Sequence, residues 1–153
     1  MKKPRYDINI KNFLPHREPM LLATITPYID EVSVVTHFKI SDDCIFLDNE
    51  GRLSEAGLIE NAAQASSAIV GQSYFDDDDL EGTGNKLVGY ISAIKKAEVF
   101  ILPEINDLLI TKAKLISRFD TGTMSICTIT SSTFRNDDLI VDCNFNFLIH
   151  EVQ

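Results

Sequence analysis

Residues 54–75 constrain the fold most, because small and apolar side chains occupy nearly every side of the helix that this segment predicts. The run from Ala62 to Val70 reads AAQASSAIV, and a helix that is apolar all round is usually buried. Ser54 is a suitable N-cap for it. Small side chains also let a sheet approach closely, so we expect this helix to lie at the centre of the molecule.

The rest of the chain predicts strands around that helix. Residues 6–18 predict a short helix or turn. Residues 20–29 and 31–40 predict a hairpin, because apolar and polar residues alternate in the second strand. The expected strands are residues 20–29, 31–40, 86–94, 97–102, 107–118, 122–134 and 138–150. A strand pair, one buried helix and then a run of antiparallel strands predict an α+β fold, with a curved antiparallel sheet wrapped around one long central helix. A length of 153 residues predicts a single domain, residues 1–153.

Charge and composition exclude several classes of function. A net charge of −9 argues against a nucleic-acid-binding protein. No stretch approaches the roughly 20 apolar residues that cross a bilayer, and no apolar run follows the basic N-terminus, so we expect neither a membrane span nor a signal peptide. Cys44, Cys127 and Cys143 are an odd number of cysteines without ligand-like spacing, which predicts reduced thiols in a cytoplasmic protein.

Glu60 is the candidate for acid–base chemistry, because a buried alanine-rich helix has no packing reason to carry a carboxylate. Burial among apolar side chains suits a carboxyl group to proton transfer near neutral pH. Gln64 lies four residues later, on the same helical face, where it can orient that carboxyl. The alternative is that Glu60 reaches solvent near the start of the helix, where the helix dipole favours a negative charge.

The histidines and the acidic run predict no metal site. His16 lies in a proline-rich turn, where it can serve at a tunnel mouth or simply bond local carbonyls. His37 is expected to face solvent and His150 to be structural, and no two histidines share ligand spacing. The run Asp76–Asp79 lacks the glutamate that would complete a calcium loop, so we interpret it as a solvated acidic loop.

Two motifs resemble the FabZ-type 3-hydroxyacyl-ACP dehydratases. Residues 14–22, LPHREPMLL, resemble that family's LPHRxPxLL segment, and residues 57–64, GLIENAAQ, resemble its catalytic helix. A fainter match joins residues 89–91 to 99–103. The resemblance covers about residues 10–110. It implies a hot-dog fold, a dimer and thioester substrates carried on the phosphopantetheine of an acyl carrier protein or CoA, with no other cofactor.

The chain departs from that family at one catalytic position. The family has a histidine fourteen residues before its acid, and this chain has Phe46 there. The family's Pro-Gly at the helix start is replaced by Ser54-Glu55. Residues 46–53, FLDNEGRL, together with the two motifs resemble a narrower group, the ApeP-type dehydratase-like proteins of aryl-polyene and flexirubin pigment clusters.

The resemblance assigns the acidic catalytic role to Glu60, and we add His16 as a second catalytic candidate. Residues expected at the substrate are Phe46, Gly57, Asn61, Gln64, Gly89 and Tyr90. Because family sites combine histidine and glutamate from different subunits, a heterodimer with a FabZ-like dehydratase could build one complete site from a partner histidine and Glu60. A homodimer stays open, as do two other functions: a hot-dog thioesterase that uses Glu60, and a non-catalytic acyl-binding or scaffold subunit.

Overall fold

The computed structural model describes residues 3–76, 78–79, 83–84 and 86–152. Its single α-helix in this described part, α1 (Glu55–Gly71), continues directly into a 3₁₀ turn, η2 (Gln72–Tyr74). The Ser54 side chain caps the helix by accepting a hydrogen bond of 3.2 Å from the backbone N–H of Gly57. The predicted helix and its N-cap are therefore confirmed.

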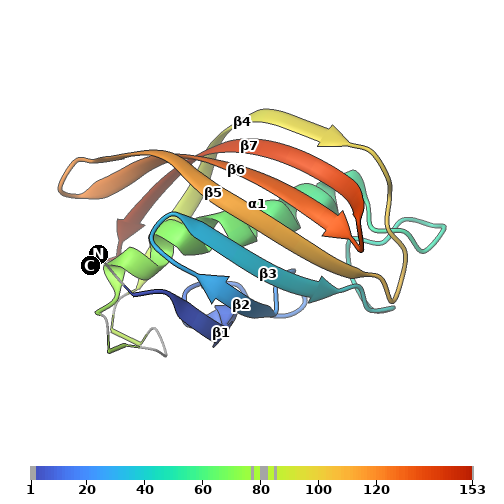
Figure 1. Ribbon diagram of the computed structural model, residues 1–153, viewed down its shortest axis with the longest axis horizontal. Coiled ribbons are helices and arrows are strands. Elements are labelled where there is room, and N and C mark those ends of the chain that lie inside the picture. The colour runs from blue at the N-terminus through green and yellow to red at the C-terminus, as the bar shows by residue number, and fades with distance from the viewer. Residues whose placement is uncertain (1–2, 77, 80–82, 85, 153) are drawn as a thin grey trace.

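One seven-stranded sheet, antiparallel throughout, curves around α1 (Figure 1). Its strands are β1 (Arg5–Asn9), β2 (Ile25–Ile29), β3 (Ser33–Lys39), β4 (Leu87–Val99), β5 (Leu108–Asp120), β6 (Met124–Arg135) and β7 (Asp138–Glu151). They are ordered β1-β2-β3-β5-β6-β7-β4, so β1 and β4 are the edges. This is the predicted α+β arrangement. No helix in the described ranges is long and apolar enough to cross a membrane.

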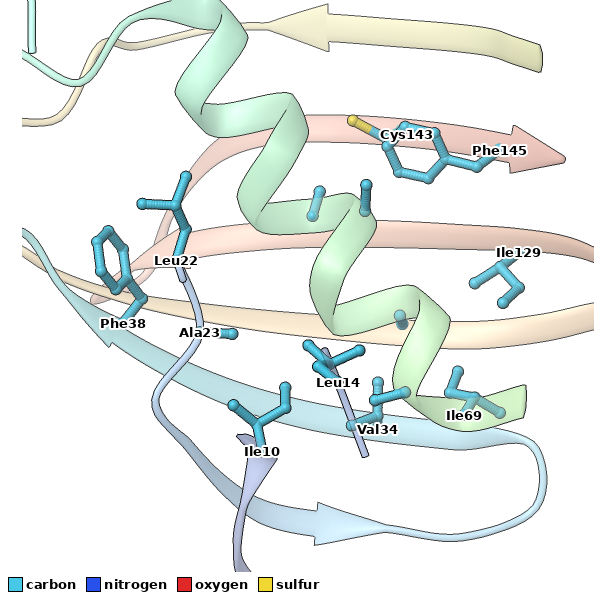
Figure 2. Packing of buried hydrophobic residues seen from close by; sticks show 14 of the residues in the cluster. Ile10, Leu14, Leu22, Ala23, Val34, Phe38, Ile69, Ile129, Cys143 and Phe145 are labelled. Carbon is cyan, nitrogen blue, oxygen red and sulfur yellow. The ribbon is translucent and has the colours of Figure 1, made fainter. Parts of the chain in front are cut away.

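The core fills the space between the helix and the concave face of the sheet. Ile69 of α1, Val34 of β3, Ile129 of β6 and Phe145 of β7 are each at most 1% exposed, and Figure 2 shows their side chains gathered around α1. Each such side chain contributes about 1.5–3 kcal/mol through burial. The alternation expected in the last strand is confirmed, since Phe145, Phe147 and Ile149 all face this core.

Residues 10–23, called the covering segment below, cover the side of α1 that the sheet leaves open. This segment begins with the 3₁₀ turn η1 (Ile10–Asn12) and supplies Ile10, Leu14, Leu22 and Ala23 to the core (Figure 2). Hydrogen bonds to side chains of α1, rather than strand pairing, hold the C-terminal end of this segment. Leu22 donates its N–H to the Gln64 side chain, and its carbonyl accepts a hydrogen bond from the Asn61 side chain.

Three expected element boundaries are wrong. Residues 6–18 begin with strand β1, which pairs with β2; its five residues alternate too weakly in polarity for a strand to be read from sequence. The strand expected over 20–29 begins only at Ile25. The two strands expected over 86–94 and 97–102 are the single strand β4, whose register shifts twice against β7, and such irregularities break the period-two pattern.

Candidate active site

A cavity of about 320 Å³ lies between α1, β4, β7 and the segment that follows η1. This volume is at the small end of the range for ligand pockets, roughly 300–1,000 Å³. The walls are mainly apolar, with a few polar groups near one end. The lining residues are Phe13, Leu14, Pro15, His16, Glu60, Ala63, Gln64, Ser67, Gly71, Leu87, Gly89, Tyr90, Ile91, Phe147 and Ile149.

His16 and Glu60 meet in this cavity although they are far apart in sequence. The imidazole Nε2 lies 3.7 Å from Glu60 Oε1, and the two side chains are 34% and 26% exposed. That separation is too long for a direct hydrogen bond. The other ring nitrogen, Nδ1, is buried and has no hydrogen-bond partner in the part of the chain that the structure covers. The pair therefore presents an imidazole and a carboxyl group that are close together but not bonded to each other.

Gln64 holds the carboxyl group in place. Its Nε2 donates to Glu60 Oε1 at 2.8 Å and to the carbonyl of Met20 at 2.8 Å. Its Oε1 accepts the N–H of Leu22, also at 2.8 Å. One buried amide thus ties the carboxyl of α1 to the covering segment, which carries His16. The helical i,i+4 spacing explains the contact between Gln64 and Glu60.

Three residues expected at the substrate lie outside this cavity wall. Asn61 is buried, and it bonds the carbonyl of Leu22 and the hydroxyl of Thr111. A Cβ added to Gly57 would lie 2.7 Å from the Cβ of Phe46, so these two residues pack against each other. Phe46 also packs on the hydrophobic core. The position of the missing family histidine is thus a packing position here.

Gly89 and Tyr90 border the cavity from the edge strand β4. Gly89 lies opposite Ile149 of β7, on the concave face of the sheet. Tyr90 is 55% exposed, and its ring stacks on His150 with the centroids 6.0 Å apart. His150 is thereby held on the strand and does not reach the cavity.

Sequence reasoning missed most of the apolar wall. Ser67 and Gly71 follow Glu60 at helical spacing on one face of α1, a signal that the sequence contained. Phe13, Leu87 and Phe147 are brought to the cavity by tertiary packing, which leaves no local pattern in the sequence.

Other potential chemistry lies elsewhere or is absent from the described ranges. Burial raises the pKa of the Cys127 and Cys143 thiols to about 11, which leaves them protonated at neutral pH. Within the described ranges, no three His, Cys, Asp or Glu side chains gather as a metal site. In the acidic run 76–79, Asp77 lies outside those ranges.

Comparison with known proteins agrees with this fold. The family model described as ApeP dehydratase, ApeP-like, matches residues 8–136. The dehydratase heterocomplex ApeI:P from Xenorhabdus doucetiae is similar with a TM-score of 0.77 and 17% identity, over 97% of this chain and 93% of that one. No curated protein sequence matches the chain.

Two other solved structures share the fold at lower similarity. The PaaI protein from the phenylacetic acid degradation operon of E. coli gives a TM-score of 0.56 and 11% identity, over 80% of this chain and 79% of that one. A thioesterase-like protein from Ralstonia eutropha gives 0.55 and 13%, over 76% and 75%. At these identities the likeness concerns the fold alone, whereas the family model covers most of the chain. The chain therefore belongs to the ApeP-like dehydratase family and has the hot-dog fold.

Proposed function

We propose that this chain dehydrates 3-hydroxyacyl groups carried as thioesters on an acyl carrier protein, with Glu60 and His16 as the acid–base pair. The observation that carries the proposal is the approach of His16 Nε2 to Glu60 Oε1, 3.7 Å, in a largely apolar cavity. Dehydration needs a base for the α-proton and an acid for the leaving hydroxyl. An imidazole and a carboxyl group are the side chains that most often supply these functions.

The reaction follows from that placement. Neutral His16 takes the α-proton while protonated Glu60 gives its proton to the 3-hydroxyl. The C–O bond breaks, a C=C bond forms, and water leaves with an enoyl thioester. The imidazolium then returns its proton to the carboxylate through a water molecule that lies beside the pair and bonds both side chains, because the 3.7 Å between the two atoms is too short to hold a water between them. Gln64 keeps the carboxyl aimed at the cavity throughout, because its amide N–H bonds the oxygen that faces His16.

We further propose a heterodimer with a FabZ-like dehydratase as the working form, in fatty-acid or aryl-polyene synthesis. The heterocomplex that resembles this chain supports the proposal. So does the long strand β4, which pairs with β7 on one side, forms the edge of the sheet on the other, and has mostly exposed residues. An exposed edge of this length favours pairing with another chain. In such a complex the imidazole can come from His16 of this chain or from a histidine of the partner.

The test is enoyl formation from a (3R)-hydroxyacyl carrier protein, measured by mass spectrometry for the chain alone and mixed with the dehydratase partner. Glu60→Gln should lower the rate by roughly 10²–10⁴-fold, whereas Glu55→Gln, an acid at the start of the same helix, should not. His16→Gln should be comparably damaging, with His37→Gln on β3 as its control.

The other outcomes assign the remaining functions. Thiol release without enoyl product would make the chain a thioesterase. Activity only with the partner, unaffected by His16→Gln but lost in Glu60→Gln, would assign the imidazole to the partner. If the activity of the complex is unchanged by both Glu60→Gln and His16→Gln, this chain is a scaffold and the proposed site is wrong.

A further inference from the structure

The cavity has a direction that the acid–base chemistry does not explain. Three of its polar side chains, His16, Glu60 and Gln64, meet at one end, where the covering segment crosses α1. From there the cavity follows α1 toward the C-terminal end of the helix. Leu87 marks this far end, because a Cβ on Gly71 would lie 3.7 Å from its Cδ1.

Two walls run parallel along this direction. On α1 the lining residues after Glu60 are Ala63, Gln64, Ser67 and Gly71, and those beyond Gln64 are small. Gly71 lies eleven residues after Glu60, or about 16 Å along a helix that rises ~1.5 Å per residue. On β4 the wall runs from Leu87 to Ile91, about 13 Å of strand. The two lengths agree, so the cavity is a slot rather than a round pocket.

Gly89 keeps the slot open at mid-length on the β4 side. A Cβ there would make an ordinary contact of 3.5 Å with Ile149 Cγ1, so a larger side chain fits the backbone but enters the slot. Ser67 occupies the corresponding place on α1, half-buried, with its hydroxyl donating to the carbonyl of Gln64 at 3.0 Å. Because this bond within the helix already uses the hydroxyl proton, an apolar ligand beside Ser67 leaves no donor unpaired.

We infer that Ser67 and Gly89 set the length of the acyl chain, and that the preferred substrate has up to roughly a dozen carbons. This inference rests on the proposed function, because it takes the thioester end of the substrate to lie at Glu60. Carbon–carbon bonds of about 1.5 Å advance an extended chain by roughly 1.25 Å per carbon, so 13–16 Å corresponds to that length.

The experiment measures binding separately from turnover. The full-length chain, with its dehydratase partner if the two form a complex, is titrated by calorimetry with unreactive pantetheine thioethers of four-carbon and twelve-carbon chains. Ser67→Leu and Gly89→Val are compared with Ser92→Val, an enlargement on strand β4 at a residue outside the cavity lining. Each methylene excluded from the slot costs up to roughly fourfold in affinity.

The expected result is a loss of at least ~30-fold for the twelve-carbon ligand in Ser67→Leu and Gly89→Val, since Ser67 lies about 10 Å from Glu60 and several carbons would be excluded. Four-carbon affinity should change less than ~2-fold, and Ser92→Val should bind both ligands like the unmodified chain. If the large substitutions prevent folding, as judged by circular dichroism, Gly89→Ala gives a smaller loss of the same kind.

The two proposals fail in different ways. Equal weakening of both ligands, or no weakening of either, would overturn the assignment of Ser67 and Gly89 even if dehydration is observed. Length-dependent binding that the two large substitutions abolish would uphold the slot, even if no hydroxyacyl thioester is dehydrated and the proposed function is therefore wrong.

Discussion

Replacing Gln64 with methionine should both destabilise the fold and disable the site, because one buried amide serves both. Methionine has a similar shape but cannot form the three hydrogen bonds of Gln64. It leaves the N–H of Leu22, a residue that is 1% exposed, without its partner, which costs about 1–3 kcal/mol. The bond to Glu60 contributes about 1 kcal/mol more, whereas the carbonyl of exposed Met20 can turn to water. We expect a total loss of about 2–4 kcal/mol in the free energy of unfolding.

Asn61→Leu is the matched control. Asn61 is also buried and also bonds the covering segment at Leu22, but its side chain bonds Leu22 and Thr111 and not the Glu60 carboxyl. Urea unfolding should show a similar loss of stability for both variants, and the thermal midpoints should fall by roughly 5–15 °C. Only Gln64→Met should in addition lower kcat for dehydration by at least ~10-fold relative to Asn61→Leu, which corresponds to about 1.4 kcal/mol of transition-state stabilisation.

Two results would refute this reasoning. If Gln64→Met unfolds at the same urea concentration as the unmodified chain, the three bonds do not hold the covering segment on the helix. If both variants lose kcat equally, the damage comes from loosening that segment, and the bond between Gln64 and Glu60 does not orient the acid.

Three further predictions follow from packing and electrostatics. Gly57→Ala should lower the free energy of unfolding by about 1–3 kcal/mol in urea titrations, because its Cβ would lie 2.7 Å from that of Phe46; an unchanged midpoint would contradict this packing. Hydrogen bonds from Ser125 and Arg118 lower the pKa of Asp120, so its stabilising contribution is present above about pH 3.9 and is lost as the pH falls through the lower folded value. Asp120→Asn should therefore have a lower free energy of unfolding than the unmodified chain, and the difference should shrink only below about pH 4. A difference that does not depend on pH would exclude this linkage. Iodoacetamide at pH 7.5 should leave Cys127 and Cys143 unmodified in the native chain, because burial raises the pKa of both thiols to about 11; their rapid labelling, seen by mass spectrometry, would show that the core opens.

The elements predicted correctly are those whose signals are local. The helix has its cap, its small apolar run and its end within residues 54–75, and β7 shows its buried face in the alternation that includes Phe145 and Phe147. Strand β1 was missed because it is stabilised by pairing with β2, more than ten residues away. Strand β4 was divided in two because its register shifts interrupt the alternation on which the prediction relied.

The same distinction applies to the site. The contact between Glu60 and Gln64 was predicted from helical spacing, because both residues lie on α1. The approach of His16 was not, since it depends on how the covering segment crosses the helix, and only tertiary packing decides that. The placement of Phe46 beside Gly57, outside the cavity wall, was missed for the same reason.

Phe46 separates two accounts of where the imidazole comes from. If the family's histidine position still faced a working site, Phe46→His would supply a second imidazole and raise the turnover of the heterodimer. Here Phe46 packs on the core beside Gly57, and its carbonyl accepts a hydrogen bond of 2.9 Å from the N–H of Ser54 at the start of α1.

An imidazole at that position would replace apolar packing without reaching the cavity that contains Glu60. We therefore expect Phe46→His to lower stability by about 1–3 kcal/mol and to leave kcat per heterodimer within ~2-fold, measured with the enoyl-forming assay. An increase of tenfold or more would mean that position 46 opens onto a site in the complex. The replacement of histidine by Phe46 would then have inactivated that site, and would not be the packing substitution that the contact with Gly57 indicates.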